Sequence, residues 1–170
     1  MPRRDEFAAV YEEHVWTVFG FIGYRVASRE EAEDLTQQTF ERALKAWKRF
    51  DPERADVRAW LLSIARNGVI DTHRKRRIPA ESLDDEARGE ADPQPFGASL
   101  GPSPELQSAL AVLSQRDREI VALRFGGDLT GAEIAAETGL SLPNVQQILS
   151  RSLRRLAEEM EDRPATDSRP

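Results

Sequence analysis

The chain of 170 residues contains no cysteine and only two histidines, His14 and His73. Without cysteine it can form no disulfide, offers no thiolate to a metal and has no thiol that senses oxidants. No group of histidine, aspartate and glutamate has metal-ligand spacing, so we expect no metal site and no cofactor. The sequence also shows no nucleophile–base pair and no phosphate-binding glycine loop. An enzyme is therefore the least favoured class of function.

Long apolar runs are missing too. No window approaches the roughly 18 uninterrupted apolar residues of a membrane span, and the first residues, MPRRDEF, lack the apolar core of a signal peptide. We therefore expect a cytoplasmic protein with no direct membrane insertion. The period-two alternation typical of β-strands is absent as well, and apolar residues instead recur at three- and four-residue intervals. This pattern predicts an all-α fold.

Charge is unevenly distributed along the chain. The net charge is −6, which at first sight opposes a nucleic-acid partner. Residues 1–78 nevertheless carry +2, whereas residues 79–104 carry −5 and contain five prolines and three glycines. Such a segment has too few apolar residues to form a core. We expect a flexible acidic linker at 79–104 between two small helical domains, 1–78 and 105–160, with a disordered tail at 161–170.

Helical periodicity and capping residues outline both domains. Ser28 and Asp56 are expected to cap the second and third helices of the first domain, and Ser103 to cap the first helix of the second. The residues expected to face a core are Phe7, Val10, Tyr11, Val15, Val18, Phe19, Ile22, Leu35, Phe40, Ala43, Leu44, Trp47, Val57, Trp60, Leu61, Ile64, Ala65, Ile70, Leu106, Leu110, Leu113, Ile120, Val121, Leu123 and Phe125.

The most informative segment is 130–156, TGAEIAAETGLSLPNVQQILSRSLRRL, which has the pattern of a helix-turn-helix. Thr130 and Glu133 form a capping box, Gly139 occupies the turn, and Ser141 caps a second helix with Pro143 in its first turn. In such motifs the second helix lies in the DNA major groove, so the segment predicts sequence-specific DNA binding. A helical hairpin used only for packing is the alternative. The apolar inner positions are Ile134, Ala135, Leu140, Val145 and Ile148.

Three longer sequence segments resemble parts of one protein family. They are AEDLTQQTFERALKAW (32–47), FDPERADVRAWLLSIARNGVIDTHRKRR (50–77) and LSQRDREIVALRFGGDLTGAEIAAETGLSLPNVQQILSRSLRRL (113–156). In this order they resemble region two and region four of the extracytoplasmic-function group of bacterial sigma factors, over most of residues 7–160. The resemblance implies an alternative sigma factor, which binds core RNA polymerase, directs it to specific promoter DNA and melts the −10 region.

The resemblance implies that the helix at 32–47 binds the polymerase. A helix that carries acceptors, donors and a cation along one face can hold another helix by charge and hydrogen bonds. An ordinary solvated helix face is the alternative. The residues concerned are Asp34, Gln37, Gln38, Phe40, Arg42 and Trp47.

The helix at 60–77 would meet the −10 element. Its cations can neutralise phosphates, and Asn67 offers a donor and an acceptor to a base edge. Opening the DNA requires bases to leave the stack, and a protein pocket can trap them. Asp71 can instead brace a neighbouring arginine, and Trp60 is more typical of core than of a stacking platform. The −10 residues are Arg66, Asn67, Asp71, Arg74, Lys75, Arg76 and Arg77.

The helix-turn-helix would read the −35 element. This chain departs from the family there, because Gln146 and Ile148 stand where lysine and arginine are common, and Pro143–Asn144 replaces a frequent small-residue–threonine pair. The departures leave the −35 specificity open. The predicted −35 residues are Ser141, Asn144, Gln146, Gln147, Ser150, Arg151, Arg154 and Arg155.

Regulation must come from elsewhere, since the chain has no thiol, metal site or sensor domain. The resemblance implies an anti-sigma protein, in many cases membrane-tethered, that holds the chain inactive. Two other interpretations stay open. One is a sigma-like decoy that sequesters an anti-sigma protein, and the other is a helix-turn-helix repressor that binds an operator as a dimer.

Overall fold

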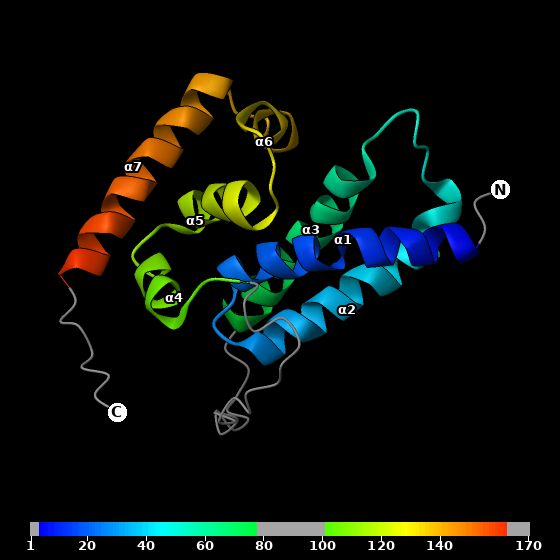
Figure 1. Ribbon diagram of the computed structural model, residues 1–170, viewed down its shortest axis with the longest axis horizontal. Coiled ribbons are helices and arrows are strands. Elements are labelled where there is room, and N and C mark those ends of the chain that lie inside the picture. The colour runs from blue at the N-terminus through cyan, green and yellow to red at the C-terminus, as the bar shows by residue number, and fades with distance from the viewer. Residues whose placement is uncertain (1–3, 78–100, 163–170) are drawn as a thin grey trace.

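The computed structural model describes residues 4–77 and 101–162, and every regular element in these ranges is helical (Figure 1). The predicted all-α fold is confirmed. No described helix is long and apolar enough to span a membrane. The predicted linker lies outside the described residues except for 101–104, as does the predicted tail beyond residue 162. The elements are α1 (Arg4–Arg25), α2 (Arg29–Ala46), the 3₁₀ turn η1 (Trp47–Arg49), α3 (Val57–Arg77), α4 (Pro104–Leu110), α5 (Gln115–Val121), the π-helical turn η2 (Ala122–Gly126), α6 (Gly131–Thr138) and α7 (Leu142–Glu161).

The helices begin where the predicted caps stand. The Ser28 hydroxyl accepts a hydrogen bond from the Glu31 amide at 3.2 Å, and the Asp56 carboxylate accepts one from the Ala59 amide at 3.0 Å. Ser103 caps α4 in the same way. Each cap satisfies an amide that has no partner within its helix, which a short polar side chain can do wherever the chain enters the helix.

Helices α1, α2 and α3 form the first module, and their shared core contains Phe21, Ile22 and Leu61, each with no exposed surface. At one end, Trp47 stacks on Phe50 with ring centroids 5.3 Å apart. Trp60 packs against Phe50 at 4.5 Å, which places it in this aromatic cluster, as the structural alternative expected.

Four residues expected in the core are instead exposed. They belong to apolar stripes, but a stripe is wider than the line of contact between two packed helices, so residues at its edge remain in solvent. Their exposed fractions are 43% for Tyr11, 46% for Leu44, 42% for Ile70 and 47% for Phe125.

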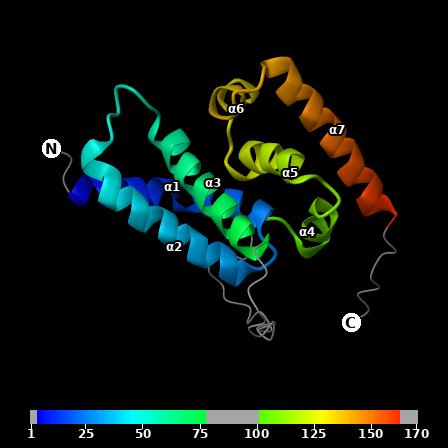
Figure 2. The ribbon, with the colours of Figure 1, turned by 180° about the vertical axis from the view of Figure 1, so that it is seen from behind.

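The second module, α4 to α7, packs directly on the first. One continuous core runs from α1–α3 into Leu123, Leu129 and Ile134 of the second module. Helix α1 crosses η2 so closely that a Cβ atom added to Gly126 would lie 2.7 Å from the Gly20 carbonyl oxygen. Figures 1 and 2 show α5 and α6 on the side facing α3, with α7 on the outside. The two modules therefore form a closed arrangement.

Candidate nucleic-acid and protein interfaces

The outer face of α2 carries the predicted polar residues. Asp34, Gln37, Gln38 and Arg42 are all exposed, and the Gln37 side-chain amide donates to Glu41 at 3.1 Å. This face can offer charges and hydrogen bonds to another protein. The two apolar residues of the predicted set, Phe40 and Trp47, are buried instead.

Phe40 and Trp47 lie beneath the α2 surface. Phe40 is buried against Phe7 and Tyr11, and Trp47 is buried in the aromatic cluster beside Phe50. Their side chains support the helix from below, and the polar residues form its accessible face.

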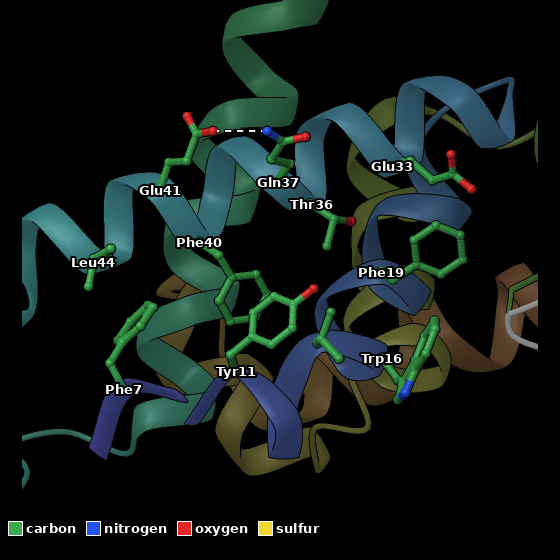
Figure 3. Close-up of a pocket in the computed structure, with 11 residues that line it drawn as sticks. Phe7, Tyr11, Trp16, Phe19, Glu33, Thr36, Gln37, Phe40, Glu41 and Leu44 are labelled. Atoms are coloured by element: carbon green, nitrogen blue, oxygen red, sulfur yellow. Dashed lines mark hydrogen bonds between the residues drawn. The ribbon is translucent and has the colours of Figure 1, made fainter. Parts of the chain in front are cut away.

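A groove between α1 and α2 adjoins this polar face, and sequence reasoning missed it. Its volume is about 620 Å³, and Figure 3 shows Tyr11 and Phe40 in its centre with Gln37 and Glu41 along one edge. Tyr11 and Leu44 remain exposed because they line this groove. The complete lining is Phe7, Tyr11, Val15, Trp16, Phe19, Glu33, Thr36, Gln37, Phe40, Glu41 and Leu44.

The end of α3 presents a basic surface. Asn67, Arg74 and Lys75 are exposed, and Arg77 is the last residue of the helix. Arg76 is also largely exposed, although its guanidinium contacts Glu31 of α2 at 2.5 Å. The accessible cations are suited to phosphate contacts.

Asp71 faces α2 across the surface of the first module. Its carboxylate lies 3.9 Å from the Arg42 guanidinium, so it pairs with an arginine of α2, as the structural alternative for this residue expected. About half of each side chain is exposed, so the pair remains accessible to a partner.

Arg66 points away from the basic end of α3 and into the module junction. Its Nε lies 2.6 Å from the Glu119 carboxylate of α5, and its Nη1 donates to the Glu137 carbonyl of α6 at 3.4 Å. Arg66 was expected among the DNA-binding residues, but in the closed arrangement its guanidinium is held by the second module. About 29% of the Arg66 side chain remains exposed.

Arg66 shares Glu119 with a second arginine. The Arg25 Nη1 lies 3.3 Å from the same carboxylate oxygen, and only 3% of the Arg25 side chain is exposed. Burial lowers the pKa of Arg25, and the charge of Glu119 opposes that shift. The three side chains form a buried ion cluster across the junction.

The sequence contains a signal for this cluster. Arg25 stands three residues after Ile22 on the buried stripe of α1, and Glu119 directly precedes the buried Ile120 and Val121 of α5. A charge on an apolar stripe needs a partner, because an unpaired buried charge is costly. The spacing alone does not show which partner it finds.

The helix-turn-helix is formed as predicted. Thr130 accepts a hydrogen bond from the Glu133 amide at 3.2 Å, and Ser141 accepts one from the Asn144 amide at 3.3 Å. Gly139 has φ 73°, a left-handed conformation that favours glycine at the end of α6. The Glu133 carboxylate differs from the expected capping box, because it interacts with the Thr130 hydroxyl and with Arg58 of α3.

Helix α7 separates an apolar from a polar face. Val145 and Ile148 are buried, as predicted, whereas Ser141, Gln146 and Gln147 are exposed and Asn144 is half-buried. Arg151 is also exposed but lies 3.6 Å from Asp117 of α5. The polar face continues through exposed Ser150, Arg154 and Arg155, and the helix itself lies on the outside of the molecule (Figure 1).

Family models match both modules. The model "Sigma-70 region 2" matches residues 10–78, and the model "Sigma-70, region 4" matches residues 109–158. The first range runs from residue 10 within α1 to the end of α3, and the second contains the helix-turn-helix.

Two curated relatives match almost the whole chain. The ECF RNA polymerase sigma factor RpoE of Cereibacter sphaeroides is 34% identical, with 92% of this chain and 88% of that protein covered. The ECF RNA polymerase sigma factor BldN of Streptomyces coelicolor is 33% identical over 93% of this chain, which spans only 61% of the length of that relative.

A solved structure shares the fold. In the complex of the sigma factor RpoE with the anti-sigma factor NepR from Bartonella quintana, the matched chain has a TM-score of 0.71 and 24% identity. The match covers 93% of this chain and 99% of the other.

Proposed function

Because this chain belongs to the extracytoplasmic-function family of RNA polymerase sigma factors, we propose that it binds core RNA polymerase in the cytoplasm, directs it to a set of promoters and melts their −10 region. The observation that carries the proposal is the combination in one chain of an exposed polar α2 face, a basic α3 end and a capped helix-turn-helix. It acts by binding and has no reaction of its own.

In this proposal α2 is the polymerase-binding element. Its exposed Asp34, Gln37, Gln38 and Arg42 support this role, because they alternate acceptors, donors and charge along one face. The adjoining groove provides apolar surface beside the polar contacts. Phe40 and Trp47 contribute by fixing the helix from within the core.

The proposed DNA contacts come from both modules. Asn67 and the cations at the end of α3 serve the −10 element, and the exposed face of α7 serves the −35 element. Asn144, Gln146 and Gln147 can pair with base edges, whereas Arg154 and Arg155 suit phosphates. The division into region two (1–78), linker (79–104) and region four (105–160) follows the same proposal.

Promoter binding requires the closed arrangement to open. The −10 and −35 elements are about 25 base pairs apart, which is roughly 85 Å of B-form DNA at 3.4 Å per base pair. In the closed arrangement Arg58 of α3 contacts Glu133 of α6 at 2.8 Å, and each of α3 and α7 is only about 30 Å long. Separation also releases Arg66 from Glu119, so that its cation becomes available to DNA.

We propose that an anti-sigma protein keeps the chain inactive. The similar fold seen in the sigma factor–NepR complex supports this proposal, as do the two uncovered surfaces of the first module, the α2 face and its groove. A protein that covers α2 excludes the polymerase without altering the DNA-binding helices.

A run-off transcription assay with core polymerase tests the proposal. We expect this chain to produce a defined transcript that core polymerase alone does not, and a variant with Asp34 and Arg42 reversed in charge to produce less. A chain that binds an anti-sigma protein but never supports a transcript would be a decoy. Operator binding without polymerase, and no transcript, would indicate a repressor.

A further inference from the structure

A second cavity lies where the two modules meet, at the ends of α1 and α3 and the start of α5. Its volume is about 280 Å³, and it is separate from the groove between α1 and α2. Its polar lining consists of Arg25, His73, Arg76, Gln115 and Arg118. Of its lining residues, Arg76 is also a proposed −10 contact, whereas Arg25, His73, Gln115 and Arg118 have no part in the proposed polymerase and promoter contacts.

Positive charge exceeds negative charge around this cavity. Three arginines line it, but the carboxylates in contact with them number only two among the described residues. Glu31 contacts Arg76, and Glu119 is shared between Arg25 and Arg66. Arg118 donates to the Tyr24 carbonyl at 2.6 Å and makes no ion pair with any residue that the structure describes. The cavity therefore attracts an anion.

Arg25 brings a buried positive charge to the wall of this cavity. Its side chain is almost fully buried, its Nη1 lies 3.3 Å from the Glu119 carboxylate, and its Nε has no hydrogen-bond acceptor within residues 4–77 and 101–162. The ion pair with Glu119 neutralises charge, and the bond from Nη2 to Gln115 at 3.4 Å is long. An anion in the cavity would add a second counter-charge to that of Glu119.

The pKa shifts of two lining residues agree with an excess of positive charge in the cavity. Burial lowers the pKa of His73, and the positive charges of Arg25, Arg76 and Arg118 lower it further. Burial together with the charge of Arg25 also lowers the pKa of Arg118. A bound anion would reverse the electrostatic part of both shifts.

We propose that this cavity binds a small phosphate-bearing anion, and that the bound anion holds the two modules in their closed arrangement. Phosphate suits the site better than a carboxylate, because its oxygens can accept from several guanidinium groups approaching from different sides. The volume equals that of roughly nine water molecules at about 30 Å³ each, which accommodates a diphosphate group.

The link to closure follows from the origin of the lining residues. Arg25, His73 and Arg76 belong to the first module, whereas Gln115 and Arg118 belong to the second. Separation of the modules divides the site, so the anion binds the closed form and stabilises it by mass action. The consequence of anion binding for transcription rests on the proposed function, because promoter binding needs the open form.

Isothermal titration calorimetry on the free full-length chain tests binding, with inorganic pyrophosphate as the probe and sodium sulfate at equal ionic strength as the reference. We expect one saturable site for pyrophosphate. Arg118→Gln should weaken binding at least about tenfold, because it removes a charge-assisted contact. Arg116→Gln is the matched control, since Arg116 is exposed on the same helix outside the cavity, and it should change the affinity less than about twofold.

A distance measurement tests closure. The chain has no cysteine, so Lys48→Cys and Ala157→Cys provide two unique positions for spin labels, one on each module. Pyrophosphate should narrow the distance distribution in the parent chain and in the Arg116→Gln variant, but not in Arg118→Gln. If Arg118→Gln does not fold, as judged by circular dichroism, His73→Gln replaces it in both experiments.

Several outcomes would overturn the inference. They are binding no stronger than that of sulfate, an affinity that Arg118→Gln and His73→Gln leave unchanged, or binding that does not alter the distances. Loss of duplex DNA binding in Arg118→Gln without any pyrophosphate site would assign the cavity to the DNA backbone instead. Titration with ADP identifies the kind of phosphate-bearing ligand. If ADP binds more tightly than pyrophosphate does, the ligand is a nucleotide. None of these measurements contains polymerase, so their failure leaves the transcription assay unaffected.

Discussion

The module junction and the outer face of α2 use charge in opposite ways. At the junction, Arg25, Arg66 and Glu119 are drawn together between α1, α3 and α5, with Glu119 almost completely buried. On α2, Asp34 and Gln38 are exposed and make no such cluster with the described residues. Charges at the junction therefore maintain the closed form, whereas charges on α2 remain available to a partner. Substitutions at the module junction should alter stability, and substitutions on the outer face of α2 should alter binding to a partner protein.

Glu119→Gln should have the largest effect. It removes the only carboxylate that Arg25 contacts in the described structure and leaves a buried cation unpaired. We expect a loss of about 3 kcal/mol in the free energy of unfolding, measured by urea denaturation.

Glu133→Gln is its matched control. The Glu133–Arg58 pair also joins the modules at 2.8 Å, but 37% and 28% of the two side chains are exposed. An exposed pair contributes less, so the loss should stay under about 1 kcal/mol. Equal losses of unfolding free energy in the two variants would show that burial does not decide how much each ion pair contributes to stability.

Gly126→Ala should open the junction by a steric route. The added Cβ would lie 2.7 Å from both the Gly20 carbonyl oxygen and the Phe21 Cα, which are backbone atoms that cannot move aside alone. We expect a cost of about 2 kcal/mol and a wider distance distribution between labels on the two modules. Gly23→Ala is the control, because among the described residues its Cβ meets Pro102 and Gly101 alone, at 3.5 Å or more, and should be tolerated.

Replacing Arg74 and Lys75 with alanine should weaken promoter binding without changing stability. Both side chains are exposed, and the removal of each phosphate contact should reduce the slope of log affinity against log salt by about 0.9. Binding to promoter DNA by the polymerase-bound chain, measured over a range of salt concentrations, gives this slope. An unchanged slope would mean that these side chains do not face DNA.

Charge reversal at Asp34 and Arg42 tests the exposed face of α2. The double variant should bind core polymerase with about 1 kcal/mol less free energy, because the complementary charges on the partner become repulsive. Its unfolding free energy should change by less than about 0.5 kcal/mol, as is usual for exposed positions. Core affinity equal to that of the parent would remove α2 from the proposed interface.

The smallest expected effect is on the pH dependence of stability. The pKa of His73 in the folded chain lies below its ordinary value, so the folded state favours the neutral imidazole. As pH falls below about 6.5, the unfolded chain takes up the proton first and stability declines. In His73→Gln this part of the pH dependence should be absent, as measured by thermal unfolding between about pH 5 and 8. Saturating pyrophosphate should reduce it, because the anion favours the charged imidazole.

Local features of the fold were predictable from the sequence. Ser28, Asp56, Thr130 and Ser141 each cap a helix through an amide three residues ahead, and Gly139 ends α6 through its own backbone conformation. Interactions of this range depend on neighbours along the chain, so pattern and spacing are sufficient to find them. The polar faces of α2 and α7 follow from the same periodicity.

The amino-acid sequence alone was therefore sufficient for the helices, the helix-turn-helix and the family, and with them the surfaces expected to meet polymerase and promoter. Tertiary packing was needed to find that the modules close on each other, that Arg66 is held by Glu119, and that Arg25 and Arg118 line one cationic cavity. These contacts join residues that are far apart along the chain. Arg118 reaches Tyr24 across 94 residues, and no periodicity relates the apolar stripes of two modules that a long proline-rich segment separates.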